Sequence, residues 1–367
     1  MIGLDGELSF SRRRYRCGGC GREFYPCDLL LGLGDGSLSP PLAKRACQLG
    51  NREGFQSLSQ LLTAQHGVRV PAKSLQRLMH AAGGVARQDH LQPVEQFFQT
   101  EPAQRSYPAC SSPPDRLYVS CDGIMFCTNQ MEPDPEHPGQ QRLGWREMKV
   151  GCVYWQERGG RWRKRLIYGM EDPQAFGRKL WYLACECGYR QARQRIFAAD
   201  GGPWCWGIAQ RHFQQATWIL DWYHASEHVW QTAAALYPAD RCQAAAWAHH
   251  CLELMRNQGG AGLLAHLKQS LRQRQNQAAD LTALGKLIDY VCNHLPQMDY
   301  PGYRASGYAI GTGMMESTAR QLVGLRLKGP GMHWSQEGAL AVTALRATEL
   351  NGQWDQFWAS NPLQRAA

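Results

Sequence analysis

The order of strand-like and helix-like segments after residue 114 is the strongest constraint on how this chain folds. Three segments rich in Val, Ile and Tyr follow one another, and helix-like and strand-like segments then alternate twice. This order predicts the α/β class, in which helices pack against a mixed sheet. The predicted strands are DRLYVSCDGIMF, EMKVGCVYW, KRLIYGM, QRIFAADGG and ATWILDWYH, and the predicted helices are PQAFGRKLWYLACECGY and one that begins at PWCWGIAQRHF.

The segments on either side of this region differ from it in composition. The stretch after Tyr223 is rich in Ala, Gln, Leu and His and poor in β-branched residues, which predicts an all-helical insertion. The stretch before Asp115 is rich in Pro and Ser and predicts a linker. We therefore divide the chain into a Cys-containing arm (1–40), a helix-turn-helix region (41–100), a linker (101–114), the first part of the α/β core (115–224), a helical insertion (225–298) and the last part of the core with C-terminal helices (299–367).

Length and charge exclude several classes of protein. The chain has 367 residues, enough for more than one domain with its own core. Its 40 Lys and Arg against 31 Asp and Glu give a net charge of +9, which permits a nucleic-acid partner. No apolar run approaches the ~18 residues of a membrane span, and the start MIGLDGELSF lacks the pattern of a secretory signal. We therefore expect a cytoplasmic protein without a membrane partner, with its 14 cysteines reduced.

Cys17 and Cys20 form a C-x-x-C pair in a basic, Gly-rich segment near the start. Two thiolates at this spacing supply half of a tetrahedral zinc site. A complete site needs a second pair, and Cys27 and the isolated Cys47 are the cysteines that follow. Two interpretations stay open: a structural zinc site, and two free thiols in a hairpin turn.

Residues 54–82 have the pattern of two helices joined by a tight turn. Apolar residues recur at helical spacing before Gly67, which ends the first helix, and Pro71 lies where a second helix begins. The second helix would present Lys73, Gln76 and Arg77 outward. A plain helical hairpin has the same pattern, but the basic face favours a helix-turn-helix that contacts DNA.

Three carboxylates lie where the predicted sheet would expose them. Asp122 lies in the first predicted strand, Asp200 ends the fourth, and Glu316 lies near the start of a late helix. Carboxylate oxygens suit Mg²⁺ or Mn²⁺, and two such ions about 3.5–4 Å apart activate an attacking oxygen and stabilise a leaving one in phosphodiester cleavage. Taken singly, an Asp before a Gly is more often a turn or cap residue.

Positive charge is concentrated in residues 142–165, which contain eight Lys or Arg against two Glu. Trp145, Trp155 and Trp162 lie among these cations. Cations that bind phosphates and aromatic rings that stack on unpaired bases make a nucleic-acid surface. The alternative interpretation is a solvated hairpin with ordinary aromatic cross-strand pairs.

One motif points to a different chemistry. His224, Glu227 and His228 fit H-x-x-E-H, in which two histidines on one helix face bind zinc and the glutamate is the base of a metalloprotease. Such a site needs a third ligand, for which Glu253 is a candidate. We favour a helix start after Asp221 with locally packed histidines.

From about residue 14 to residue 358 the chain resembles the ISKra-type bacterial insertion-sequence transposases, a group with an RNase H-like DDE catalytic domain. The matching segments come in order and cover nearly the whole chain. They are RRYRCGGCGREFYPCD followed by LLLGLG, then YVSCDG, AADGGPWCW, ILDWYHASEHV, GTGMMESTARQLVGLRLKGPGMHWSQEGALAVTALRA and WDQFW.

The resemblance implies roles for these residues. Asp122, Asp200 and Glu316 would be the catalytic triad that binds Mg²⁺ or Mn²⁺, and the helical insertion would lie between the second Asp and the Glu. The partners would be the terminal inverted repeats of the element and target DNA, bound by at least a dimer. Lys73, Gln76 and Arg77 would contact the repeats, and the late segment would contact DNA beside the active site through Arg326, Lys328 and Trp334.

The chain departs from the pattern of this family in two places. Family members usually carry more sequence before the CGGC knuckle, often with another C-x-x-C pair, so we expect an N-terminally shortened copy. Thr312 stands where the family has a Ser. The sequence therefore predicts a DNA transposase that hydrolyses a phosphodiester at the ends of an insertion sequence and transfers the strand. The alternatives are a non-catalytic DNA-binding remnant and, less favoured, the zinc metalloprotease.

Overall fold

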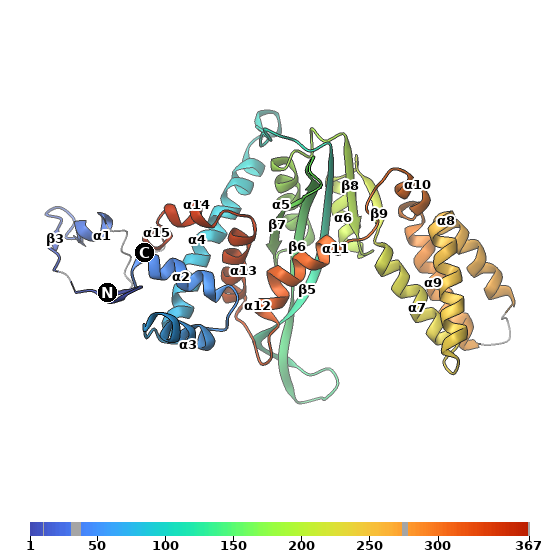
Figure 1. Ribbon diagram of the computed structural model, residues 1–367, viewed down its shortest axis with the longest axis horizontal. Coiled ribbons are helices and arrows are strands. Elements are labelled where there is room, and N and C mark those ends of the chain that lie inside the picture. Colours follow the sequence, from blue (N-terminus) through green and yellow to red (C-terminus); the bar gives the residue numbers. More distant parts are fainter. Residues whose placement is uncertain (10, 31–37, 274–277, 366–367) are drawn as a thin grey trace.

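A five-stranded mixed sheet in the order β7-β6-β5-β8-β9 lies in the middle of the molecule (Figure 1). The computed structural model describes residues 1–9, 11–30, 38–273 and 278–365. β5 is parallel to β8, which is parallel to β9, whereas β6 is antiparallel to both β5 and β7. This confirms the predicted mixed α/β class and is consistent with an RNase H-like fold. The strands are β5 (Arg116–Pro133), β6 (Gln141–Gln156), β7 (Trp162–Gly169), β8 (Gln194–Ala199) and β9 (Thr217–Leu220).

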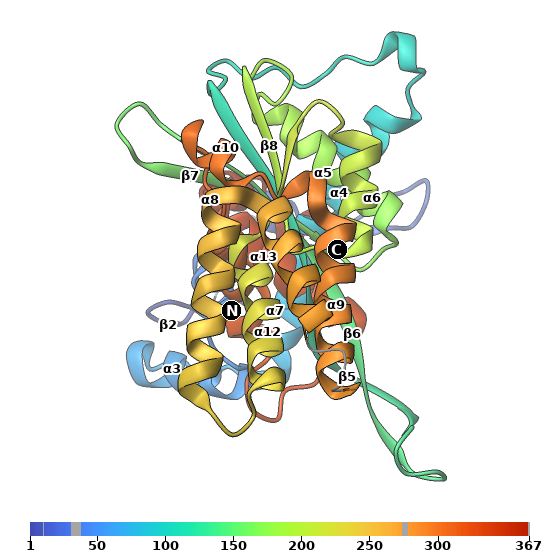
Figure 2. The same cartoon turned by 90° about the vertical axis from the view of Figure 1, so that its right-hand side faces the viewer.

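The strands β5, β6 and β9 differ in length from the prediction. β5 and β6 pair well beyond the predicted segments, with a shift of register between Cys127 and Met131, and form a hairpin that projects from the sheet (Figure 2). β9 ends at Leu220, four residues before the predicted end, because the Asp221 side chain accepts hydrogen bonds from two backbone N–H groups and caps the helix α7 (Trp222–Leu236).

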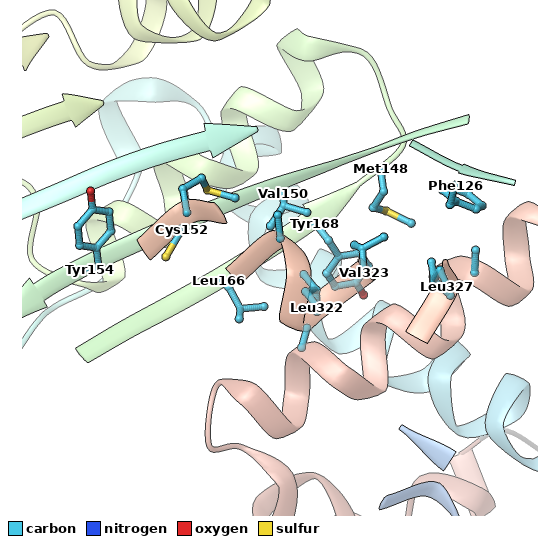
Figure 3. Packing of buried hydrophobic residues seen from close by; sticks show 14 of the residues in the cluster. Phe126, Met148, Val150, Cys152, Tyr154, Leu166, Tyr168, Leu322, Val323 and Leu327 are labelled. Carbon is cyan, nitrogen blue, oxygen red and sulfur yellow. The ribbon is translucent and has the colours of Figure 1, made fainter. Parts of the chain in front are cut away.

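Helices cover both faces of the sheet. On one face, α5 (Pro173–Glu186) and α6 (Pro203–His212) pack against Val119, Val153 and Phe197. On the other face, the late segment packs against Met148, Val150 and their neighbours (Figure 3). This late segment consists of α11 (Gly313–Ala319), the π-helical turn η3 (Arg320–Gly324), α12 (Leu325–Leu327) and α13 (Gln336–Leu350).

The predicted helix pair is present and is joined to the core. α3 (Phe55–His66) ends at Gly67, whose φ of +66° is in the left-handed region, and α4 (Ala72–Gln99) begins after Pro71. α2 (Pro40–Gly50) packs against both helices. α4 is longer than a recognition helix needs to be, and it lies along α13, so this region shares its core with the sheet domain.

The chain between β9 and α11 is helical, as predicted. α7, α8 (Arg241–Gln273) and α9 (Ala278–His294) pack side by side in a lobe at one end of the molecule (Figure 1). α8 is kinked at Gly259. The turn η2 (Leu295–Gln297) and the short helix α10 (Tyr300–Ala305) lead back to the sheet.

The remaining elements are short. None of the helices that the structure describes is both long and apolar enough to span a bilayer. Of the LLLGLG segment, residues 31–34 lie outside the described part of the chain. The short elements are β1 (Ile2–Gly3), β2 (Gly6–Glu7), β3 (Tyr15–Arg16), β4 (Glu23–Phe24), α1 (Pro26–Leu30), η1 (Pro102–Gln104), α14 (Trp354–Ala359) and α15 (Pro362–Arg365).

Candidate active site

Two of the three predicted carboxylates lie next to each other on the sheet. In the parallel register of β5 and β8, Ser120 is the partner of Ala198. Two residues further along from each of these partners, Asp122 and Asp200 come side by side on the sheet face that the late segment covers. The fold therefore places both carboxylates at the carboxyl end of β8, a position that the sequence spacing alone did not establish.

The backbone around Asp200 holds its carboxylate in place. Asp200 Oδ1 accepts a hydrogen bond from the Gly202 N–H at 3.0 Å, and the Cys205 thiol lies 3.8 Å from the same oxygen. Gly201 has a φ of +105°, which only glycine adopts without strain. A Cβ atom on Gly201 would also lie 3.2 Å from the His294 Nε2 atom. The glycine after Asp200 is thus required by both backbone conformation and space.

The environment of Asp122 disfavours its negative charge. Burial raises the pKa of the Asp122 carboxyl to about 6, and the negative charge of Asp200 acts in the same direction. The hydrogen bond from the Gly123 N–H at 2.6 Å opposes this shift. Two neighbouring carboxylates that repel each other are an arrangement that a divalent cation stabilises.

The third predicted carboxylate is not grouped with these two. Glu316 lies in the first turn of α11, and its side chain is exposed. Among the described residues, no three His, Cys, Asp or Glu side chains are arranged to hold a metal ion. The structure thus brings together Asp122 and Asp200, and leaves Glu316 on the neighbouring helix that crosses β5 and β6.

Asp221 connects the start of that helix to the sheet. Asp221 is 4% exposed, and one of its oxygens caps α7 while the other accepts hydrogen bonds from the backbone N–H and the hydroxyl of Thr312. Thr312 therefore supplies the hydroxyl that a Ser would supply at this position. The sequence contained the helix-capping signal of Asp221, but it could not show that the second oxygen binds a residue 91 positions away.

Histidines from two helices of the lobe gather beside Asp200. His224 and His228 lie one turn apart on α7 and meet edge to face, with ring centroids 5.1 Å apart, and the His228 ring centroid lies 4.0 Å from that of Tyr290. Burial lowers the pKa of His294, and the charges of His228 and His224 add to this effect while that of Asp200 opposes it. His294 is a neighbour of the carboxylates that the sequence analysis missed, because it lies 94 positions after Asp200 in the chain.

The geometry lacks the third ligand that the metalloprotease alternative requires. Glu227 is exposed and lies 3.8 Å from the His224 ring nitrogen, on the same helix. Within the described residues, no third His, Cys, Asp or Glu completes a metal site with His224 and His228. His228 instead packs against the Tyr290 ring, and His224 packs against the ring of His228.

The knuckle is formed as a small exposed hairpin. β3 and β4 pair on either side of it, and Cys17 and Cys20 are both exposed. Backbone N–H groups of Cys20 and Gly19 donate to the Cys17 sulfur and lower its pKa. In the part of the chain that is described, no third ligand joins the two thiols, and Cys47 is fully buried in the core of α2.

The residues expected to contact DNA fall into two groups. Lys73, Arg77 and Lys328 are exposed and Gln76 is half-buried, so their side chains are available at the surface. Arg326 is different, because it is 1% exposed.

Arg326 and Trp334 are part of the core, which corrects the expectation that they touch DNA. The Arg326 Nε atom donates to the Gly50 carbonyl oxygen at 2.8 Å, and the guanidinium lies between the rings of Phe55 and Trp334, at 5.0 and 4.8 Å from their centroids. Trp334 is 6% exposed, and its Nε1 atom donates to the Leu327 carbonyl oxygen. Both side chains join the late segment to α2 and α3.

Half of the cations in residues 142–165 are paired with carboxylates. These pairs are Arg142 with Asp134, Arg146 with Glu132, Lys149 with Glu147 and Arg163 with Glu157. In this fully described stretch, the other four cations have no carboxylate at ion-pair distance; they are Arg158, Arg161, Lys164 and Arg165. Trp145 and Trp162 are exposed, whereas Trp155 packs against the core under α5 and α6.

Comparisons with known proteins add little to this geometry. No protein-family model matches the chain, and no curated protein matches it. A solved structure entitled "Drosophila P element transposase strand transfer complex" aligns with 90% of this chain and 83% of that chain, with a TM-score of 0.31 and 8% sequence identity. At this TM-score the likeness carries no conclusion about fold or function.

Proposed function

We propose that this chain is a DNA transposase that uses Asp122, Asp200 and Glu316 for metal-dependent phosphodiester hydrolysis and strand transfer at the ends of an insertion sequence. The observation that carries the proposal is the Asp122–Asp200 pair at the carboxyl end of β8. The resemblance of the sequence to ISKra-type transposases supplies the reaction, and the closeness of two of its three expected carboxylates supports the proposal.

The donor atoms at this pair suit a divalent cation. Asp122 and Asp200 offer carboxylate oxygens on one face of the sheet, which are the ligands that Mg²⁺ and Mn²⁺ prefer. When bound, such ions activate the attacking water or 3′-hydroxyl and stabilise the leaving oxygen. Asp122 itself is held by the Gly123 N–H, and Asp200 by the Gly202 N–H, so both carboxylates keep their orientation before any ligand binds.

Glu316 is proposed as the third carboxylate of the site. It lies one helical turn after Thr312, which is fixed to the buried Asp221 carboxylate. This link joins the start of α11 to the end of β9, the strand beside β8 in the sheet. The DNA ends would be bound by the exposed Lys73, Arg77 and Lys328 together with Gln76, and two copies of the chain would pair two ends.

A strand-cleavage assay tests this proposal. The substrate is a duplex that carries the inverted repeats flanking the reading frame, incubated with the full chain and Mg²⁺. We expect cleavage by the wild type, at least a 100-fold loss of rate in Asp200→Asn and Glu316→Gln, and unchanged duplex binding in both. Glu253→Gln, which alters an exposed carboxylate on α8, is the matched control and should cleave normally.

Two outcomes would contradict the proposal in different ways. A wild type that binds the end-bearing duplex but never cleaves it would favour the non-catalytic remnant. If Glu316→Gln cleaved as fast as the wild type, the assignment of the third carboxylate would be wrong while the role of Asp122 and Asp200 stood.

A further inference from the structure

A cavity of about 660 Å³ lies between the sheet, the helical lobe and the start of α11. Its volume is in the range of sites that bind small molecules or single nucleotides. Four different parts of the fold line it: the paired strands β6 and β7, the helix α7, the helices α8 and α10, and the segment that leads into α11. The residues used below include Tyr154, Trp162, Tyr223, Arg256 and Arg304.

Aromatic rings form one side of this cavity and are already fixed in place. Trp162 is 40% exposed, and its ring packs against those of Tyr118 and Tyr154, with centroids 5.9 and 5.8 Å away. Tyr118 and Tyr154 are themselves stacked, with an interplanar angle of 10°. The rim of the Trp162 ring is therefore held rigidly while part of its surface stays free for a ligand.

Tyr223 offers a second exposed ring. It is 66% exposed although it lies between the buried Asp221 and the core of α7. A Cβ atom on Gly311 would lie 2.6 Å from this ring, so the ring packs as closely against Gly311 as a glycine permits. An exposed tyrosine whose ring rests on a glycine costs little entropy when it stacks on a ligand.

Two unpaired cations also line this cavity. Arg256 and Arg304 are both exposed, and in the described part of the chain neither has a carboxylate at ion-pair distance. No Asp or Glu is among the described residues that line the cavity. Guanidinium groups without acidic neighbours are suited to bind phosphate.

The cavity lies next to the proposed catalytic residues. Gly313 and Met314 line it, and Glu316 follows in the same turn of α11. Tyr223 precedes His224, which lies close enough to Asp122 to affect its pKa. The start of α11 and the start of α7 thus contribute both to this cavity and to the surroundings of the proposed catalytic carboxylates.

We infer that this cavity binds one unpaired nucleotide of a DNA strand, with its base stacked on Trp162 or Tyr223 and its phosphate bound by Arg256 and Arg304. Exposed rings and unpaired guanidinium groups that line one cavity match the two parts of a nucleotide. The inference rests on the proposed function, because it takes DNA to be the partner, and it adds a recognition site that the carboxylates do not provide.

A binding experiment without divalent metal tests this inference. The probes are a blunt duplex and the same duplex with a short single-stranded 3′ overhang that carries 2-aminopurine, both in EDTA so that no cleavage occurs. We expect the full-length wild type to bind the overhang duplex about 10-fold more tightly than the blunt one, and to quench 2-aminopurine fluorescence by stacking.

Substitution of the aromatic residues or of the arginines that line the cavity should remove the stacking or the preference for the overhang. Trp162→Leu and Tyr223→Leu should lose most of the quenching, and the double variant Arg256→Ala with Arg304→Ala should lose the 10-fold preference. The matched controls are Trp230→Leu, an exposed aromatic residue further along α7, and Arg272→Ala, an exposed cation at the far end of α8. Both controls should bind as the wild type does, and circular dichroism checks that every variant is folded.

The outcomes separate this inference from the proposed function. A wild type that shows no preference for the overhang would overturn the inference even if the protein cleaves DNA. The same holds if the folded variants of Trp162, Tyr223, Arg256 and Arg304 keep both the preference and the quenching. A wild type that shows the preference but never cleaves an end-bearing duplex would contradict the proposed catalysis and leave the nucleotide site supported.

Discussion

Arg326 and Lys328 show how two cationic residues, two positions apart in one segment, take different roles. Its guanidinium is stacked between two aromatic rings and bonded to a carbonyl oxygen, and burial lowers its pKa to about 10. Lys328 is exposed and has no such contacts. A sequence pattern of basic residues beside a catalytic helix does not reveal which cation is buried, because this depends on α2 and α3, which come some 270 positions earlier.

We therefore expect Arg326→Ala to affect stability and Lys328→Ala to affect DNA binding. Arg326→Ala should lower the free energy of unfolding by about 3 kcal/mol, because it removes the stacked side chain and leaves a cavity. Lys328→Ala should change the free energy of unfolding by less than about 0.5 kcal/mol. It should weaken DNA binding and reduce the slope of log affinity against log salt concentration by about 1, as expected for the loss of one phosphate contact. Urea unfolding and binding measured against salt concentration check both. An Arg326→Ala protein that is as stable as the wild type would contradict the structural role.

At the scale of elements, the contact between α4 and α13 depends on one glycine. A Cβ atom on Gly83 would lie 2.2 Å from the Ala341 carbonyl oxygen, whereas a Cβ atom on Gly84 would meet nothing within 4 Å. The two helices are therefore as close as their backbones permit at this point. The packing of α4 on α13 thus requires a glycine at position 83 but not at position 84.

The pair Gly83 and Gly84 gives a matched test of this contact. Gly83→Ala should lower the free energy of unfolding by about 2 kcal/mol or more, because the helices must separate. Gly84→Ala should raise it by up to about 1 kcal/mol, since alanine favours the helix and meets open space. Chemical unfolding of both variants measures this difference. Equal effects of the two substitutions would contradict the close packing of α4 on α13.

His90 connects three elements and makes stability depend on pH. It lies on α4, with its ring nitrogens 3.3 Å from the Tyr168 hydroxyl on β7 and 3.2 Å from the Thr348 hydroxyl on α13. Burial lowers its pKa to about 4, Arg165 and Lys179 act in the same direction, and Asp89 opposes them. The unfolded chain therefore binds a proton below the ordinary pKa of about 6.5 that the folded chain excludes.

The free energy of unfolding should thus fall as the pH decreases from 6.5 toward 4. Between pH 7 and pH 5 the contribution of His90 amounts to about 2 kcal/mol. In His90→Gln this part of the pH dependence should be absent, although the variant is less stable at pH 7. Urea unfolding at several pH values measures the difference between the two slopes. Parallel slopes in wild type and variant would show that His90 is not the titrating group.

Local sequence patterns predicted most elements of the sheet domain, and long-range contacts explain where they failed. Apolar periodicity placed β7, α5 and α6 closely, because each is bounded by Gly, Pro or a capping residue. β9 was predicted too long because Trp222 and Tyr223 look like strand residues, while the Asp221 cap starts a helix there. The extended β5–β6 hairpin carries polar and Gly residues that have no strand pattern.

The sequence predicted the carboxylates of the candidate site that lie in or beside strands, and it missed the contacts that depend on residues far apart in the chain. Asp122 lies in a predicted strand and Asp200 lies at the end of another. Whether the two side chains are close therefore depends only on which strands are neighbours in the sheet. Glu316 belongs to a helix whose position depends on Asp221 and Thr312, and the histidines beside Asp200 come from two helices of the insertion. Contacts of this kind join residues about 90 positions apart, where sequence periodicity carries no information.

At the scale of the whole molecule, the parts proposed to bind DNA and to cut it share one continuous core. The helix pair α3–α4 is joined to the sheet through α13, and the lobe of α7, α8 and α9 lies at the opposite end (Figure 1). The carboxylate pair lies on the sheet between them. Movement of either end relative to the sheet would therefore disturb contacts that also place α11 and Glu316.

The proposed catalysis requires Asp122 and Asp200 to bind a divalent cation together, and Mn²⁺ binding tests this most directly. Titration of the full chain with Mn²⁺, followed by the loss of the free-ion electron paramagnetic resonance signal, should show a site in the wild type and in Glu253→Gln. The same site should be weakened at least 10-fold in both Asp122→Asn and Asp200→Asn. Unchanged Mn²⁺ affinity in folded Asp122→Asn and Asp200→Asn proteins would contradict the account.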